Sequence, residues 1–484
     1  MSLFRRKSIA ALEAEASDEH GLRRVLGPLH LTLLGVGGII GTGIFVLTGT
    51  VAAQNAGPAV TISFVLAGLA SVFGACYSSL RPSSRWPGAP TPYGYATLGE
   101  LFAWIIGWDL ILEYAFAGST VAVGWSGYVV SFLSHLGLDL PARLSAARGT
   151  VVTLADGGTV TALFNLPAVL IILVVTVMLV VGIRESARLN NLIVFVKVGV
   201  ILLFLAFGAQ AIDPANWQPF IPPNTGSREH FGVSGIVAGA GIVFFAYIGF
   251  DAVSTAAQEA KNPKRDMPIG ILGSLAICTV LYLAVSAVAT GVLPYGQLDM
   301  PDPIAKVADA AGLGWMTRLI ELGAIAGLSS VMLVQLMAQA RVFWSMSRDG
   351  LLPPVVNRIH PKFGTPWITQ IAIGVAVAIP AGFLTVREAA SLVSIGTLLA
   401  FVIVCSAVLV LRIREPSLRR PFRVPAVWLV APAGIVACLY LMYFLPLRTW
   451  LRLLVWLALG FVVYFGYGRR HSRLAAGTRG GEAA

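Results

Sequence analysis

Charged side chains are scarce in this chain of 484 residues, of which Asp, Glu, Lys and Arg make up only 12%. Soluble domains carry about 25%, so the scarcity excludes a water-soluble globule. Apolar residues make up 57% of the chain, and the mean hydropathy is +0.80. Runs of about 20 apolar residues, long enough to cross a bilayer, recur between residues 29 and 467. The composition predicts one polytopic membrane domain.

Cysteine and histidine are also rare, and their spacing excludes several site types. The four cysteines lie inside apolar runs without paired spacing, which argues against disulfides and zinc. The six histidines lie in tails, loops or span ends, so we expect no metal site. No paired acids and no nucleophile with its base are visible, so we expect no enzyme. The net charge of +11 resides mostly in short loops, where it orients the chain in the membrane rather than binding nucleic acid.

Twelve spans are predicted, and the positive charges orient them. The charged first 25 residues lack a convincing cleavage site, so we read them as a tail rather than a signal peptide. Most of the 34 Lys and Arg residues fall in the two tails and the even-numbered loops, which predicts cytoplasmic termini. The opposite side holds Arg143, Arg148, Arg228, Lys306, Arg318, Arg387, Arg448 and Arg452. The predicted spans are 29–55, 58–78, 97–133, 164–183, 189–212, 231–257, 267–292, 315–347, 366–386, 389–412, 424–443 and 448–467.

Spans 1 and 6 differ from the others because their sequences disfavour a continuous helix. Span 1 contains GVGGIIGTGIF (35–45), with five glycines in nine residues, and each glycine costs about 1 kcal/mol inside a helix. Span 6 contains GFD, in which Gly249 and Asp251 interrupt an apolar run. Two interruptions five spans apart predict an inverted repeat of spans 1–5 and 6–10, each opening with a broken helix. The alternative is that the glycines serve close helix packing.

Four motifs resemble those of the amino acid–polyamine–organocation (APC) superfamily of transporters. They are GVGGIIGTGIF (35–45), FFAYIGFD (244–251), QEAKNPKRDMPIGI (258–271) and RVFWSMSRDGLLP (341–353). GYATLGELFAWIIGWDLILEY (94–114) resembles the bacterial relatives of cationic amino acid transporters. The resemblance implies an all-α LeuT-like fold, alternating access, and amino acid uptake, with protons rather than sodium as the coupling ion in several bacterial members. It also implies an organisation of N-terminal tail (1–25), transport core (26–413), helices 11 and 12 (414–468) and C-terminal tail (469–484).

The broken helices supply the candidate substrate site. Free N–H groups at the start of the second half of span 1 suit a carboxylate, and free carbonyls at both breaks suit an ammonium. The resemblance assigns Phe245 as the aromatic lid, the alternative being an ordinary core residue. From spans 1 and 6 the candidate substrate-binding residues are Ile40, Gly41, Thr42, Gly43, Ile44, Phe244, Phe245, Ala246 and Ile248.

Buried ionisable residues are further candidates. Glu113 lies about 20 Å along a helix from Glu100, and the resemblance places it near the substrate's polar groups; the alternative is a structural hydrogen bond. For Asp109, Asp251 and Glu321 we favour structural pairing or interfacial solvation. Because a carboxylate inside the bilayer costs roughly 2.5 kcal/mol or more unless it is protonated or faces a cavity, each of these residues needs a structural explanation.

Lys197 is the candidate proton carrier. It follows Arg188 by about 13 Å of helix, which is too deep for its ammonium to reach the membrane surface easily. In proton-coupled relatives a lysine at this position takes the place of a bound cation. The resemblance therefore implies contacts with span 1 near Gly38 and with the span 8 hydroxyls of Ser329 or Ser330. The alternative is a static internal counter-ion.

One segment departs from the family pattern. SSLRPSSRWPGAPTP (78–92) stands where the family has a sequence like AEFASIVPVAGSAYT. The genetic code allows EFASIVPVAGSAYT in the neighbouring frame, so we hypothesise two compensating single-base changes in the gene. A stop codon or an unrelated peptide in that frame would refute this. Taken literally, the prolines and arginines of the segment break the end of span 2 and leave activity in doubt.

The sequence as a whole predicts a secondary active importer of amino acids in the bacterial inner membrane. The alternatives are an exchanger without proton coupling, a channel, or a nutrient receptor that does not transport. The expected partners are a small amino acid and the lipid bilayer, and a small accessory membrane subunit is a candidate. No cofactor is expected apart from the proton as coupling ion.

Overall fold

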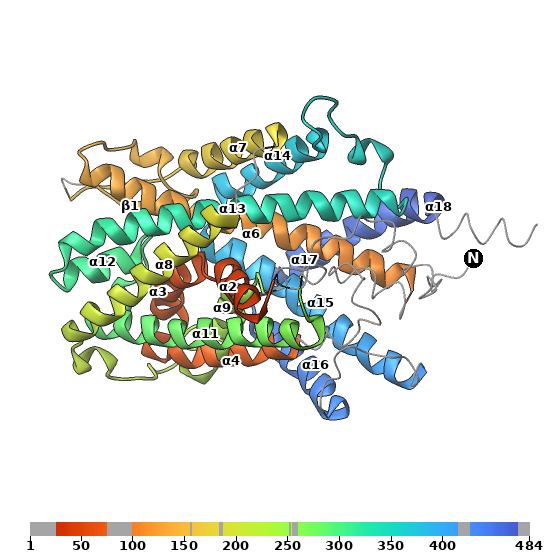
Figure 1. The fold of residues 1–484 in the computed structure, drawn as a ribbon. Coiled ribbons are helices and arrows are strands. Elements are labelled where there is room, and N and C mark those ends of the chain that lie inside the picture. Colours follow the sequence, from red (N-terminus) through yellow and green to blue (C-terminus); the bar gives the residue numbers. More distant parts are fainter. Residues whose placement is uncertain are drawn as a thin grey trace, which may run out of the picture.

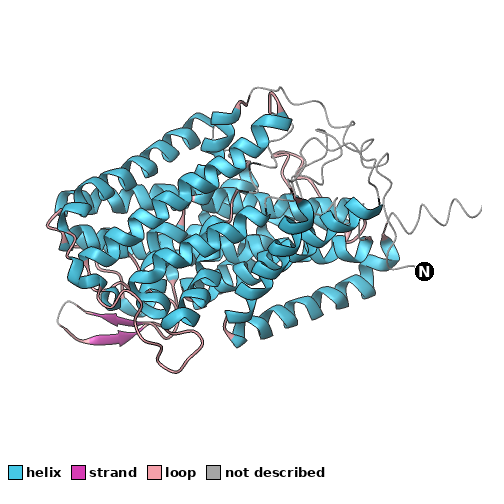
Figure 2. Cartoon of the chain, turned by 90° about the horizontal axis from the view of Figure 1, so that it is seen from below, coloured by secondary structure: helices cyan, strands magenta, loops and turns pink. Residues whose placement is uncertain are grey.

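The computed structural model describes residues 26–74, 99–154, 157–182, 187–250, 253, 260–414 and 426–472. The predicted tail 1–25, the segment 78–92, Asp251, Glu259 and most of the tail 469–484 lie outside the described residues. The described chain is almost entirely helical, with one small hairpin (Figure 2). Eight helices are long and apolar enough to cross a membrane, and four shorter apolar helices complete the set within the described ranges.

The first five spans open with a broken helix. Span 1 consists of α2 (Pro28–Ile39), then η1 (Gly43–Leu47), α3 (Thr48–Val51) and η2 (Ala52–Ala56). A turn at Gly57, which has φ +60°, and the short η3 (Gly57–Ala59) lead into span 2, α4 (Val60–Gly74). Spans 3, 4 and 5 are α6 (Glu100–His135), α7 (Leu166–Val181) and α8 (Ala187–Gly208). Between spans 3 and 4 lie η5 (Ala142–Leu144) and the antiparallel strands β1 (Val151–Thr153) and β2 (Thr159–Thr161).

The next five spans repeat this order. After η6 (Ala209–Ala211) and η7 (Pro214–Trp217), span 6 begins with α9 (Gly232–Val243) and η8 (Phe244–Tyr247). Span 7 is α11 (Pro263–Val292), which is followed by η10 (Tyr295–Gln297) and the short helix α12 (Pro303–Ala310). Spans 8, 9 and 10 are α13 (Gly314–Arg348), α14 (Trp367–Phe383) and α15 (Val386–Arg414), with η11 (Pro354–Asn357) after α13. The final pair is α16 (Val427–Phe444) and α17 (Leu447–Val463), extended by η12 (Tyr464–Gly468) and α18 (Arg469–His471).

The packing of the helices reveals the internal symmetry. Span 1 (α2) packs on span 7 (α11), and span 6 (α9) packs on span 2 (α4). Span 3 (α6) packs on span 10 (α15), and span 8 (α13) packs on span 5 (α8). Spans 3 and 8 lie against each other, as do spans 4 and 9. Each pair of packed spans therefore has a counterpart in which both spans are replaced by those five places away in the chain. Because each half has an odd number of spans, the second half crosses the membrane in the opposite orientation to the first.

The apolar surface lies where lipid is expected. Spans 5, 11 and 12 carry largely exposed apolar side chains, such as Phe195 at 63%, Leu429 at 72% and Val462 at 70% exposure. Water would penalise such a surface, whereas hydrocarbon does not. Figure 1 shows α12 and β1 at one end of the bundle and α18, which precedes the C-terminal tail, at the opposite end. With cytoplasmic termini, as the charges predict, α12 and the hairpin lie at the outer end.

Candidate functional site

The breaks of spans 1 and 6 lie against each other. α2 ends at Ile39, and η8 is followed by Gly249 at φ +116°. A Cβ at Gly249 would lie 2.5 Å from the Gly38 carbonyl oxygen, and one at Gly43 would lie 2.3 Å from the Cβ of Ala246. Only glycine permits this approach, since real Cβ atoms are not found at such distances. The glycines that disfavour continuous helices thus bring the two interrupted backbones together.

Lys197 lies beneath the break of span 1. Its side chain projects from α8, is 1% exposed, and donates from Nζ to the carbonyl oxygens of Gly37 at 2.5 Å and Ile40 at 2.9 Å. These carbonyls belong to the last turn of α2 and its C-cap, where a helix lacks partners for its oxygens and favours a positive charge. The predicted contact with span 1 is present, with Gly37 and Ile40 rather than Gly38 as acceptors.

Tyr282 joins the two breaks from a third element. This residue of α11 is fully buried, and its hydroxyl lies 2.9 Å from the Ile39 carbonyl oxygen and 2.7 Å from the Ala246 carbonyl oxygen. One hydroxyl hydrogen serves one acceptor at a time, so the bond is shared between the two breaks. Tyr282 therefore holds the ends of α2 and η8 in register.

A narrow cavity lies between the breaks. Among the described residues it is lined by Gly38, Ile39, Gly41, Thr42, Gly43, Val121, Phe245, Ala246, Ile248, Val331 and Gln335. In this conformation it has room for about one water molecule, so a larger ligand requires the walls to separate. The hydroxyl of Thr42 is buried at the cavity wall and has no hydrogen-bond partner within the described part of the chain. A buried orphan hydroxyl costs about 1–3 kcal/mol, and a polar ligand in the cavity would satisfy it.

The structure brings most of the candidate residues of spans 1 and 6 to this cavity. Gly38, Gly41, Thr42, Gly43, Phe245, Ala246 and Ile248 line it. Ile40 contributes its carbonyl to Lys197 instead, and Ile44 is buried outside the lining. Phe244 packs edge-on against Phe401 of α15, with ring centroids 5.7 Å apart. Of the two neighbouring phenylalanines, Phe245 is thus the one placed to cover a ligand.

Glu113 lies beside the cavity rather than in its wall. The carboxylate is 4% exposed and accepts a hydrogen bond from the hydroxyl of Thr397 on α15 at 2.9 Å. The residue is not part of the lining. This geometry matches the structural hydrogen bond that the sequence left as the alternative, and it uses Oε2, one of the two carboxylate oxygens.

The span 8 serines have different surroundings. The hydroxyl of Ser329 accepts a hydrogen bond from the Trp125 indole at 2.9 Å and donates to the Ile325 carbonyl at 2.8 Å. It is thus directed to α6 rather than to Lys197. Gly327 is one α13 residue against the lysine, because a Cβ there would lie 3.3 Å from Lys197 Cδ. Ser330, three residues further along, shares that helix face.

Three cavity residues escaped sequence reasoning: Val121 on α6, and Val331 and Gln335 on α13. The valines give no signal, because apolar residues in an apolar span do not reveal which face meets a ligand. Gln335 could have been found, since a polar side chain within a predicted span indicates a protein interior or a cavity.

The remaining buried acids divide into one with partners and one without. Glu321 accepts a hydrogen bond from Ser131 at 2.8 Å and lies 3.1 Å from His135 Nδ1, which confirms structural pairing. Asp109 is 1% exposed, and neither of its carboxylate oxygens has a hydrogen-bond partner among the residues that the structure describes. Within the described residues Asp109 therefore has neither the structural pairing nor the interfacial solvation expected for it. A neighbour on α15 is Gly396, where a Cβ would lie 3.2 Å from Oδ1.

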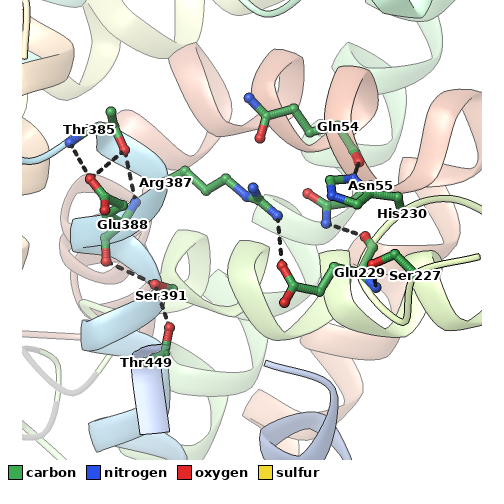
Figure 3. A network of polar contacts seen from close by, with 10 residues as sticks. All are labelled: Gln54, Asn55, Ser227, Glu229, His230, Thr385, Arg387, Glu388, Ser391 and Thr449. Atoms are coloured by element: carbon green, nitrogen blue, oxygen red, sulfur yellow. Dashed lines mark hydrogen bonds and ion pairs between the residues drawn. The ribbon is translucent and has the colours of Figure 1, made fainter. Parts of the chain in front are cut away.

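A polar network closes the predicted outer end (Figure 3). Asn55, at the end of the span 1 helices, donates to the Glu229 carbonyl at 2.6 Å, and its own carbonyl accepts from Phe231 N at 2.7 Å. Arg387 of α15 reaches across to the Glu229 carboxylate at 3.6 Å. His230 Nδ1 lies 2.7 Å from the Gln54 carbonyl oxygen. The outer halves of both broken spans are thus bonded to each other on this side.

Two inverted halves, each opening with a broken helix at a shared buried cavity, define a membrane transporter of the LeuT-like fold. Residues 26–463 match the amino acid permease family. The chain belongs to this family and thereby to the APC superfamily, so it is a transporter rather than an enzyme.

Three relatives illustrate the range of the family. The chain is 50% identical to the branched-chain amino acid permease BcaP of Bacillus subtilis (strain 168), over 98% of this chain and 99% of that protein. It is 47% identical to the methylthioribose transporter of the same organism, with the same coverage. It is 39% identical to the vacuolar cationic amino acid transporter 4 of Arabidopsis thaliana, over 86% of this chain and 68% of that protein.

Proposed function

We propose that this protein imports small neutral amino acids with apolar side chains across the bacterial inner membrane, coupled to protons, by alternating access. The observation that carries the proposal is the cavity between the two breaks. Its polar groups are peptide groups, the unpartnered hydroxyl of Thr42 and the amide of Gln335, and the other described lining side chains are apolar.

The cavity chemistry suits a zwitterion. The first N–H groups of the helix that begins at η1 have no acceptor within it, and with the Thr42 hydroxyl they offer donors to a carboxylate. Carbonyls at the break of span 6 offer acceptors to an ammonium. Val121, Phe245 and Val331 surround the space left for a side chain. No described lining residue carries a carboxylate to pair with a cationic side chain, which favours neutral over cationic amino acids.

Lys197 is our candidate for proton coupling. Protonated, its ammonium holds the last carbonyls of α2 through charge-assisted bonds, which are worth about 1.5–3 kcal/mol each. Without the proton the group loses its charge, so the inner half of span 1 is held less tightly. Proton release to the cytoplasm would thereby favour an inward-open state, in the orientation with cytoplasmic termini.

Uptake by purified protein in proteoliposomes tests the substrate class. Radiolabelled leucine should accumulate when the outside is more acidic than the inside, and excess valine or isoleucine should compete. Arginine should compete poorly. Competition by methylthioribose but by no amino acid would show that the substrate is that thioether sugar rather than an amino acid. A leucine-dependent thermal shift without any flux would identify a receptor.

The variant Lys197→Met tests the coupling, with Lys362→Met as the matched control because Lys362 is exposed on a loop. Lys197→Met should abolish proton-driven accumulation while exchange of internal for external leucine continues. The control should retain both. Proton-driven accumulation that persists in Lys197→Met would exclude the lysine as carrier, and exchange without accumulation in the parent would identify a proton-independent exchanger.

A further inference from the structure

The short helix α12 is tightly packed over the outer half of span 1. It contacts η1, α3, α8, α11 and α13. A Cβ at Gly49 of α3 would lie 2.5 Å from the Leu298 carbonyl oxygen and 2.6 Å from Pro303 Cβ, and one at Gly127 of α6 would lie 2.5 Å from Pro301 Cβ. Glycines on spans 1 and 3 thus let residues 298–303 fit closely between them. Access to the cavity from this end requires the segment to move.

A cluster of titratable groups is buried where α12 begins. Asp302, at the N-cap of α12, is 4% exposed, and its Oδ2 has no hydrogen-bond partner in the described ranges. Glu321 of α13 is fully buried and lies 3.1 Å from His135 Nδ1, while the side chain of His135 is 33% exposed. Ser131 of α6 donates to Glu321 at 2.8 Å and lies near enough to Asp302 to influence its carboxylate. The cluster therefore runs from the surface at His135 to the buried Asp302.

The cluster is connected to the substrate cavity through Tyr128. Both carboxylates act electrostatically on this fully buried tyrosine of α6. The Tyr128 hydroxyl donates to the Phe45 carbonyl at 2.8 Å, and the two rings pack edge-on with centroids 6.0 Å apart. Phe45 belongs to η1, the same short helix that contributes Gly43 to the cavity. A change in the charge of the cluster can therefore act on Tyr128, whose hydrogen bond to Phe45 leads to the short helix that lines the cavity at Gly43.

The surrounding charges do not balance the two carboxylates. On α12, Lys306 faces Asp302, while Asp309 is exposed and accepts from Thr317 at 3.2 Å. On α13, Arg318 is exposed. η1 and α3 carry no titratable side chain, α8 contributes Lys197 near the centre of the bundle, and α11 contributes Tyr282 at the breaks. With one close lysine for two buried acids, and with His135 beside Glu321 charged only when it is itself protonated, the closed arrangement needs a bound proton to approach neutrality.

We propose that Asp302, buried beside Glu321, is a second proton-binding site, and that a proton bound there holds α12 closed over the outer end of the cavity. The proposal rests on the proposed transport function for its physiological role. It is distinct from the coupling assigned to Lys197, because the two sites lie on different elements and act on opposite halves of span 1.

The burial of Asp302 determines whether acidic or alkaline pH favours closure of α12. Burial has the largest effect and raises the pKa of Asp302, and Glu321 raises it further, while the nearby Ser131 hydroxyl and the charge of Lys306 lower it. When α12 lifts, Asp302 returns to water and to its ordinary pKa. The closed state therefore binds the proton more tightly than the open state. Closure is favoured at acidic external pH and weakens as the pH rises through the closed-state pKa.

Labelling of a single cysteine measures closure without substrate or gradient. In full-length protein with its four native cysteines replaced, Leu298→Cys puts a thiol in the segment beneath α12, where Leu298 is fully buried. A membrane-impermeant maleimide is applied to the outside of intact cells. Because thiol reactivity itself rises with pH, each labelling rate is divided by the labelling rate of the same protein in denaturant at the same pH. The corrected rate should rise by at least about threefold from pH 5 to pH 8, within the limit of tenfold per pH unit for one linked proton.

Neutral variants provide the decisive comparison. Asp302→Asn should keep labelling slow and make it nearly independent of pH, and Glu321→Gln should reduce the pH dependence. Asp309→Asn, which changes an exposed acid on the same helix, should behave like the parent. An unchanged pH profile in both Asp302→Asn and Glu321→Gln would overturn the proposal, as would the absence of labelling from the outside at every pH. If Asp302→Asn does not fold, Glu321→Gln decides alone.

The outcome is separable from that of the transport assay. A pH-dependent closure that disappears in Asp302→Asn supports the second site even if Lys197→Met leaves proton-driven accumulation intact. Conversely, loss of accumulation in Lys197→Met supports the proposed function even if the labelling rate at Leu298→Cys does not depend on pH. That labelling result would reject the second site alone.

Discussion

The close approach of the two breaks predicts a specific sensitivity at Gly43. In Gly43→Ala, the new Cβ would lie 2.3 Å from Ala246 Cβ and 2.5 Å from Ala246 Cα, a backbone atom that cannot rotate away. Since carbon atoms prefer a separation of about 3.5–4.0 Å, η1 and η8 must move apart by more than about 1 Å. We expect both stability and substrate binding to fall, because the same two elements form the cavity.

A comparison with Gly199→Ala gives the free-energy cost of the clash in Gly43→Ala. Gly199 lies within α8, and a Cβ there would meet nothing within 4 Å. Both substitutions gain up to about 1 kcal/mol of helix propensity, so their difference isolates the steric clash. Overpacking costs about 1–3 kcal/mol, which corresponds to about 5- to 150-fold in an equilibrium constant. Gly199→Ala should equal or exceed the parent in stability, while Gly43→Ala should fall below both.

Thermal unfolding in detergent, with and without leucine, measures both effects. Because a ligand at free concentration L stabilises the folded state by RT ln(1 + L/Kd), a weaker leucine-dependent shift in Gly43→Ala at the same leucine concentration reports weaker binding. Adding Ala246→Gly should restore part of the loss, since it removes one clashing carbon and leaves only the backbone carbon of residue 246 in the way. If Gly43→Ala matches Gly199→Ala in both stability and leucine response, the two breaks do not meet as described.

Two further substitutions test the buried acids of α6. Asp109→Ala removes two unsatisfied oxygens and should raise thermal stability by about 1–3 kcal/mol before any cavity cost; lower stability, or loss of uptake, would show that this carboxylate has a role that the structure does not display. Glu113→Gln keeps a hydrogen-bond acceptor for Thr397 and should leave the KM for leucine within about twofold, since the residue lies outside the lining; a tenfold increase in KM would place Glu113 at the substrate.

The architecture could be predicted from sequence because its signals are strong. Long apolar runs place the spans within a few residues: span 1 was predicted at 29–55 and begins at Pro28, and span 7 was predicted to end at 292, where α11 ends at Val292. The glycines at 35–43 predicted the break of span 1 because their backbone cost does not depend on tertiary contacts. The hairpin β1–β2 and the helix α12 were not predicted, because short elements in loops lack a long periodic pattern.

The site could be predicted only where backbone chemistry determines it. Residues at the breaks were found because interrupted helices expose peptide groups, and Lys197 was found because a deep lysine needs acceptors. Val121 and Val331 were missed because helix packing, not residue type, decides which apolar side chain meets a cavity. Ser329 illustrates the same limit: neighbouring positions of a helix differ by about 100°, so the hydroxyl faces Trp125 rather than Lys197.

The two proposed proton sites act in one sequence. A proton on Lys197 holds the carbonyls of Gly37 and Ile40, which keeps the inner half of span 1 in place. A proton on the Asp302 cluster holds α12 over the outer half, through the packing at Gly49. With both protons bound, both ends are closed, and release from Lys197 toward the cytoplasm opens only the inner end. Reversing the pH gradient should therefore reverse the direction of net leucine flux in the parent. Asp302→Asn, permanently neutral at the outer site, should slow net flux in either direction while it leaves the equilibrium accumulation ratio unchanged.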